Sequence, residues 1–171
     1  MSLSVSDMKR LFGLLNTELV RENNSGELYL VGGAVMCLAF GARASTKDVD
    51  GFFRPTTIIR KAACRVALDA QISEDWLNDA VKGFLSNEGE FSEYLELSNL
   101  KIMTARPEYL LAMKCLAMRL GEEFHDEADI RFLLRYLNIS SYAQALKIIE
   151  KYYPRELFPP KTLYALEELL P

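Results

Sequence analysis

Two aspartates separated by one residue are the side chains of this chain best suited to chemistry. They lie in the segment 47–53, where Lys47 precedes them, Val49 separates them, and Gly51 and two phenylalanines follow. Successive residues of a strand point to opposite faces of a sheet, so Asp48 and Asp50 would point the same way. Two adjacent carboxylates repel each other unless a cation lies between them, and Mg²⁺ commonly binds one or two carboxylates together with phosphate oxygens. The pair therefore predicts a site for Mg²⁺ or Mn²⁺, with Asp48 and Asp50 as the metal ligands.

A pair of glycines precedes the aspartates. Gly32 and Gly33 close the apolar run 28–31, which has the composition of a strand. Glycines at the start of a helix let backbone N–H groups approach a phosphate closely. The apolar stretch 34–40 predicts a short helix, so the two motifs fall into the order strand, helix, strand. Fourteen residues separate Gly33 from Asp48.

This order of motifs resembles the signature of the DNA polymerase β-like nucleotidyltransferase superfamily, in which a hydrophobic strand, Gly-Gly or Gly-Ser, a short helix and Asp-x-Asp follow one another. The resemblance implies Mg²⁺-dependent transfer of a nucleoside monophosphate from a nucleoside triphosphate to a hydroxyl of RNA, a protein or a small molecule. It assigns Asp48 and Asp50 to catalysis, and Gly32 and Gly33 to nucleotide binding. The superfamily usually has a third carboxylate on a neighbouring strand. Glu96 is the best-placed candidate by sequence, and a solvated glutamate on an edge strand is the alternative.

A lysine stands in the middle of an apolar helix predicted over 108–120. This helix is apolar nearly all the way round, as buried helices are. Burying an unpaired ammonium group is costly, so Lys114 needs either a partner or a path to solvent. Two interpretations stay open: Lys114 reaches the surface, or it points into a catalytic cleft toward the triphosphate or the paired aspartates.

The same region resembles bacterial nucleotidyltransferase-like proteins of the abortive-infection toxin type. The residues that match are Pro107, the Leu-Leu-Ala-x-Lys helix ending at Lys114, Arg119, Asp126, Asp129 and Ile130. The resemblance implies that Lys114 and Arg119 lie near phosphates. It makes Lys114 a catalytic and nucleotide-binding residue and Arg119 a nucleotide-binding one, and it makes an antitoxin a candidate partner. Asp126 could instead cap a helix, and Asp129 could pair with Arg119 or Lys114.

The composition is that of a globular protein. The chain has 171 residues, 50% of them hydrophobic, and a formal net charge of −4. That charge argues against a broad nucleic-acid-binding surface. No stretch is long and apolar enough to span a bilayer, and the N-terminus lacks a signal-peptide pattern, so we expect no membrane association.

Cysteine and histidine usage narrows the classes of site. The three cysteines, Cys37, Cys64 and Cys115, sit far apart among apolar neighbours, which is typical of reduced core residues in a cytoplasmic protein. His125 is the single histidine of the chain. A zinc site that needs several histidines is therefore excluded.

The predicted fold class is α/β, of the α+β type. We expect a small mixed β-sheet core flanked by helices over residues 1–105, and a C-terminal helical bundle over 106–171 packed on it. Within the core, residues from Ser73 to Phe84 are predicted to form a helix with a hydrophobic staple. On it, Trp76 would be a buried structural residue, or Asn78, Asp79 and Lys82 would bind the acceptor.

Two other functions compete with the enzyme. The chain could keep the nucleotidyltransferase fold as a catalytically weak or inactive module that binds nucleotide or protein. Alternatively, Asp48 and Asp50 could be solvated residues of an ordinary α/β domain. The uncertain third carboxylate favours the binding module, whereas the glycine pair, the aspartate pair and the lysine helix together favour the enzyme.

Overall fold

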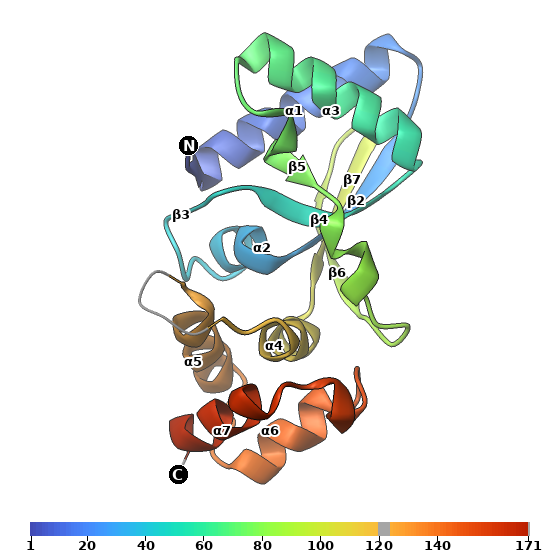
Figure 1. Ribbon diagram of the computed structural model, residues 1–171. Coiled ribbons are helices and arrows are strands. Elements are labelled where there is room, and N and C mark those ends of the chain that lie inside the picture. The colour runs from blue at the N-terminus through green and yellow to red at the C-terminus, as the bar shows by residue number, and fades with distance from the viewer. Residues whose placement is uncertain (120–123, 171) are drawn as a thin grey trace. The chain divides into compact units, whose positions relative to one another are not determined.

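The structure is a computed structural model that describes residues 1–119 and 124–170. The chain divides into two compact units. The first unit contains Met1–Gly83 and Phe91–Ala105, and the second contains Phe84–Glu90 and Arg106–Pro171. Figure 1 shows the helices and strands of both units, each of which is described here by itself.

A five-stranded mixed sheet is the centre of the first unit, with its strands in the order β5-β4-β2-β7-β6. The strands are β2 (Gly26–Val31), β4 (Val49–Arg54), β5 (Leu77–Asn78), β6 (Phe91–Glu96) and β7 (Leu100–Ala105). Strand β2 is antiparallel to β4 and parallel to β7, while β4 is parallel to β5 and β6 is antiparallel to β7. The predicted mixed sheet with flanking helices is thereby confirmed. A small antiparallel sheet of β1 (Leu3–Ser4) and β3 (Ser45–Thr46) was not predicted.

One face of the large sheet is covered by α1 (Val5–Arg21) and α3 (Thr56–Ala70), which pack against each other (Figure 1). Leu28 of β2 is fully buried on this face. A Cβ atom added at Gly26, which points to the same side, would collide with Cδ1 of Ile59 on α3. The apolar stripes of both helices therefore form the core of the first unit.

The opposite face of the sheet carries the aspartate Asp50. Alternate residues of a strand share a face, so Asp50 lies on the same side of β4 as Phe52. The rings of Phe52 and Tyr29 stack with centroids 4.6 Å apart, and Phe91 meets both rings edge-on. All three aromatic side chains are only half-buried. Asp50 thus lies on the side of the sheet that faces away from α3.

The connection from β2 to β4 differs slightly from the prediction. Helix α2 spans Gly32–Leu38, so it begins at the first glycine of the pair rather than at Ala34. Gly41, with a φ of 59°, follows the helix in the left-handed conformation that glycine favours. Strand β4 begins at Val49, which leaves Asp48 immediately before the strand.

The segment 73–84 does not form the predicted helix. It contains a 3₁₀ turn (Glu74–Trp76), the strand β5 and a second 3₁₀ turn (Ala80–Phe84). Pairing of β5 with the free edge of β4 satisfies backbone groups that a helix would have satisfied internally. The side chain of Trp76 is buried, and its indole Nε1 donates a hydrogen bond of 3.1 Å to the carbonyl of Ala63. Trp76 is therefore a structural residue.

The second unit is helical. Its helices are α4 (Pro107–Leu116), α5 (Asp126–Tyr136), α6 (Tyr142–Ile149) and α7 (Pro160–Leu169). Helix α4 contacts α5, α6 and α7. It ends at Leu116, earlier than predicted, and residue 120 of the prediction lies outside the described residues. The expected arrangement of these helices as a bundle stays a prediction.

Tyrosines attach the segment Phe84–Glu90 to the helices of the second unit. The hydroxyl of Tyr109 on α4 accepts a hydrogen bond of 2.9 Å from the backbone N–H of Ser86. The hydroxyl of Tyr153 donates a hydrogen bond of 2.5 Å to the carbonyl of Phe84. Across residues 1–119 and 124–170, every helix is too short or too polar to cross a bilayer.

Candidate functional site

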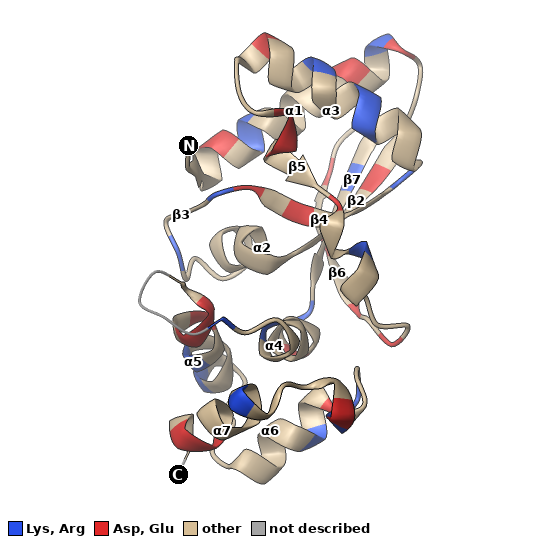
Figure 2. Cartoon of the chain, in the orientation of Figure 1, with Lys and Arg blue, Asp and Glu red and all other residues tan. Residues whose placement is uncertain are grey.

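The paired strands β2 and β4 bring the two sequence motifs together. In their antiparallel register Asp50 lies opposite Val31, the last residue of β2, and the glycine pair follows directly. Asp48 and Asp50 are both half-buried. Figure 2 shows basic and acidic residues along the ribbon that leads from β3 into β4. The acidic end of β4 therefore adjoins the start of α2.

Gly32 lies beside the carboxylate of Asp50. Its φ of 65° lies in the left-handed region, where a side chain is strained. A Cβ atom at this position would also lie 3.2 Å from Oδ2 of Asp50. Glycine is thus required here both by the backbone conformation and by the nearby carboxylate.

Gly33 is required for a different reason. A Cβ atom at this position would lie 3.2 Å from Cζ of Arg43 and 2.5 Å from Oγ1 of Thr46, and it would collide with Nη2 of the same arginine. The side chains of Arg43 and Thr46 therefore fill the space beside Gly33. Both belong to the connection that leads into β4, and sequence reasoning missed them. Their only signal was a position between the glycine pair and the aspartate pair.

The environment of Asp48 disfavours its negative charge. Burial raises the pKa of the Asp48 carboxyl above its ordinary value of 3.8, the charge of Lys47 lowers it, and the negative charge of Asp75 raises it again. Asp48, Lys47 and Asp75 line a hollow of about 350 Å³, to which Asn78 also contributes. A cation bound here would relieve the unfavourable burial of the carboxylate. Sequence reasoning missed Asp75 because it comes from the 3₁₀ turn before β5.

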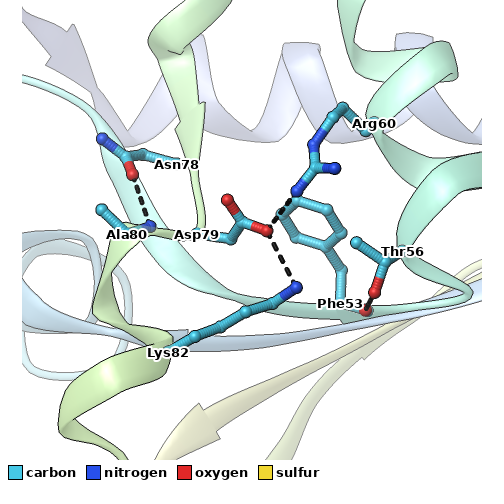
Figure 3. Close-up of polar contacts among 7 residues, drawn as sticks. All are labelled: Phe53, Thr56, Arg60, Asn78, Asp79, Ala80 and Lys82. Carbon is cyan, nitrogen blue, oxygen red and sulfur yellow. Dashed lines mark hydrogen bonds and ion pairs between the residues drawn. The ribbon is translucent and has the colours of Figure 1, made fainter.

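The strand beside β4 offers an amide instead of a third carboxylate. In the parallel register of β4 and β5, Asn78 lies next to Asp50. The Oδ1 atom of Asn78 accepts a hydrogen bond of 2.8 Å from the backbone N–H of Ala80 (Figure 3). An amide oxygen can bind a cation, but it does not act as a base at neutral pH.

The acidic residue that follows Asn78 is already paired. Asp79 lies 2.5 Å from Nη2 of Arg60 on α3 and 3.0 Å from Nζ of Lys82, as Figure 3 shows. The hydrogen bond from Lys82 is the main reason why the pKa of Asp79 lies below its ordinary value. Asp79 thus links α3 to the segment after β5. The interpretation of Asn78, Asp79 and Lys82 as acceptor-binding residues stays a prediction.

The structure does not bring Glu96 to the aspartate pair. Glu96 of β6 pairs with Lys101 of β7, which pairs with Glu27 of β2. Glu27 in turn pairs with Arg54, at the end of β4 opposite to Asp50. Glu96 is therefore about 13 Å away along the strands and three strand spacings, about 14 Å, across the sheet. This corrects the expectation for Glu96, because β6 lies at the edge of the sheet opposite to β5.

Lys114 is paired within the second unit. Its Nζ atom lies 2.7 Å from Oδ2 of Asp129 and 3.7 Å from Oδ1 of Asp126. The side chain of Lys114 is 11% exposed. Of the roles considered from the sequence, pairing of Asp129 with Lys114 is confirmed.

Arg119 binds Asp126, the second acidic residue near Lys114. Its backbone N–H and its Nε each donate a hydrogen bond of 2.9 Å to Oδ2 of Asp126. Burial raises the pKa of Asp126, but the hydrogen bonds from Arg119 and the charge of Lys114 outweigh burial and leave the pKa below its ordinary value. The N-cap position of α5 is taken by His125, so Asp126 is not the cap residue. Lys114 and Arg119 are thus occupied by carboxylates of α5.

Asp48 and Asp50 are suited to a hard divalent cation that is shared with a ligand. Among residues 1–119 and 124–170, no group of three or more His, Cys, Asp or Glu side chains could hold a metal ion. Mg²⁺ does not require such a group, since it commonly binds one or two carboxylates and takes its other ligands from water and phosphates. The assignment of Mg²⁺ to Asp48 and Asp50 stays a prediction.

A scan against protein-family models, a search of curated proteins and a search of solved structures found no match for this chain. The resemblance to nucleotidyltransferases therefore rests on the sequence motifs.

Proposed function

We propose that the protein is a Mg²⁺-dependent nucleotidyltransferase. It would move a nucleoside monophosphate from a nucleoside triphosphate to a hydroxyl of RNA, a protein or a small molecule. The observation that carries this proposal is the position of the Asp50 carboxylate beside Gly32, with Asp48 immediately before the same strand. It brings the start of α2, whose first backbone N–H groups have no partner within the helix, close to a carboxylate suited to Mg²⁺.

Each residue of the site would have one role in the transfer. Asp48 and Asp50 would hold Mg²⁺, which when bound would neutralise charge on the phosphates. The backbone of Gly32 and Gly33 would contact the phosphate oxygens. The acceptor oxygen would form a bond to the α-phosphorus while the bond to the bridging oxygen breaks, and pyrophosphate would leave. The hydroxyl proton would pass to solvent, since the strand next to Asp50 offers Asn78 rather than a base.

Asn78 also supports a second candidate function. A site with two carboxylates and an amide can bind a Mg²⁺-nucleotide without activating an acceptor hydroxyl. The protein would then be a nucleotide-binding module with weak or no turnover. We also propose an antitoxin partner, which the resemblance implies, and a cytoplasmic location, which the cysteine usage of the sequence indicates.

A transfer assay separates the two functions. The protein is incubated with Mg²⁺, each labelled nucleoside triphosphate and total RNA or cell extract as the acceptor. We expect labelled acceptor with the wild-type protein and none with Asp48→Ala or Asp50→Ala. The matched control is Asp69→Ala, which removes an exposed carboxylate from α3 and should leave transfer unchanged.

Binding without transfer would favour the module, and the variant Asn78→Asp then gives a direct test. It adds a carboxylate next to Asp50, so it should tighten Mg²⁺ binding and allow transfer to begin. A wild-type protein that binds no Mg²⁺-nucleotide in a calorimetric titration would refute both functions.

A further inference from the structure

The guanidinium group of Arg43 lies beside the second residue of the glycine pair. Gly32 is next to the carboxylate of Asp50, whereas Gly33 is next to Arg43 and Thr46. The turn that would bind phosphate therefore has an acidic residue beside its first glycine and a basic residue beside its second.

The position of Arg43 is set by packing. Its Nε atom is buried, and its Cζ atom would lie 3.2 Å from a Cβ at Gly33. Thr46 is 8% exposed, with Oγ1 2.5 Å from the same point. Thr46 belongs to β3, which pairs with β1. A side chain held in this way loses little additional freedom when it binds a ligand.

The two cations that the resemblance assigned to phosphates contact carboxylates of the second unit. Lys114 is paired with Asp129, and Arg119 with Asp126, all within the second unit. Arg43 instead belongs to the same unit as the glycine pair and the aspartates. A guanidinium group also matches phosphate geometry better than an ammonium group, because it can donate two parallel hydrogen bonds.

We infer that Arg43, assisted by the hydroxyl of Thr46, binds the phosphate chain of the nucleoside triphosphate. This inference rests on the proposed function and adds to it the residues that recognise the phosphates. It predicts that the site discriminates a triphosphate from a nucleoside through Arg43, independently of Lys114 and Arg119.

The test uses inorganic tripolyphosphate with Mg²⁺, which requires no assumption about the base. Its affinity is measured by calorimetry for the wild-type protein, Arg43→Gln and Arg43→Lys. A charge-assisted hydrogen bond is worth enough that Arg43→Gln should lose about 10- to 100-fold in affinity. Arg43→Lys keeps the charge but not the paired donors, so it should lose several-fold. Arg10→Gln, an exposed arginine on α1, should bind as the wild type does.

Thermal unfolding of each variant is recorded beside its affinity, and adenosine is titrated as a ligand without phosphate. A folded Arg43→Gln protein with wild-type affinity for tripolyphosphate would overturn the inference. So would an equal loss for adenosine and ATP, since this would indicate a structural role for Arg43. If Arg43→Gln does not fold, Arg43→Lys decides, and wild-type affinity in that variant overturns the inference.

The failure of the proposed function gives a different result. A wild-type protein that binds neither tripolyphosphate nor any nucleoside triphosphate with Mg²⁺ would refute the nucleotidyltransferase itself. Binding that is lost in Asp50→Asn but unchanged in Arg43→Gln would refute only the role of Arg43.

Discussion

Replacing Lys114 with methionine removes the ammonium group from a buried ion pair between α4 and α5. The substitution keeps an unbranched apolar side chain of similar length, so it changes charge more than packing. The carboxylate of Asp129, whose side chain is 2% exposed, loses its partner at 2.7 Å. Asp126 keeps its hydrogen bonds from Arg119. The cost should therefore arise mainly at Asp129.

The size of the effect follows from the distance and the burial. At an effective dielectric constant of about 20, two unit charges 2.7 Å apart attract each other by about 6 kcal/mol. The cost of removing both charges from water offsets much of that attraction while the pair is intact. When one partner is removed, the buried charge that remains keeps its own cost, and such variants typically lose about 3–5 kcal/mol. We expect Lys114→Met to lower the free energy of unfolding of the second unit by about this amount.

Urea unfolding followed by circular dichroism measures the change. The matched control is Lys147→Met, the same substitution at an exposed lysine of α6, which should change stability by less than about 0.5 kcal/mol. The double variant Lys114→Met/Asp129→Leu removes both charges and should recover most of the loss. The same variants, titrated with Mg²⁺ and nucleoside triphosphates, measure whether Lys114 contributes to nucleotide binding.

Two results would contradict this reasoning. A loss below about 1 kcal/mol in Lys114→Met would show that the pair behaves as a solvent-exposed one. A double variant as unstable as the single one would show that the loss comes from packing around residue 114 rather than from an uncompensated charge on Asp129.

Three further predictions concern single side chains. Asp48→Asn should raise the melting temperature measured without divalent cations, because burial raises the pKa of Asp48 and its charged form therefore destabilises the fold above that pKa. The same variant should no longer be stabilised by Mg²⁺. An unchanged response to Mg²⁺ would contradict this prediction. Gly33→Ala should lower the free energy of unfolding by about 1–3 kcal/mol, because its Cβ would meet packed side chains. The control is Gly13→Ala on α1, whose Cβ would meet nothing within 4 Å and which should not destabilise the protein in the same unfolding assay. The pKa of Asp126 is lowered in the folded protein, so its contact with Arg119 stabilises the fold at pH values above 3.8, the ordinary pKa of an aspartate. This stabilisation is lost as the pH falls below 3.8. The stability of Asp126→Asn should therefore depend less on pH than that of the wild type during acid unfolding.

Local features of the sequence were sufficient for the elements around the site. Ser4 and Asp7 form a capping box at the start of α1, and the apolar stripe that follows forms the buried side of this helix. The run before the glycine pair is a strand, and Asp50 follows it in the next strand. Lys114, inside an apolar helix, was expected to need a partner, and it has one. These inferences depend on residues close together in the chain.

Interpretations that depended on distant residues fared differently. Glu96 was a plausible third carboxylate by sequence, yet the strand order puts β6 at one edge of the sheet and β5, with Asn78, beside Asp50. The segment 73–84, which contains β5, has the pattern of a helix, but pairing of β5 with the free edge of β4 determines its conformation.

The sequence by itself determined the strand before the glycine pair and the helix that buries a charge, because periodicity and side-chain type act over a few residues. Only the tertiary structure decided that Arg43 packs beside Gly33, that Asn78 lies beside Asp50 and that Asp129 is the partner of Lys114. The reason is that strand order and register are set by contacts between segments far apart in the chain. A shift of one residue in any strand would turn its side chains to the other face.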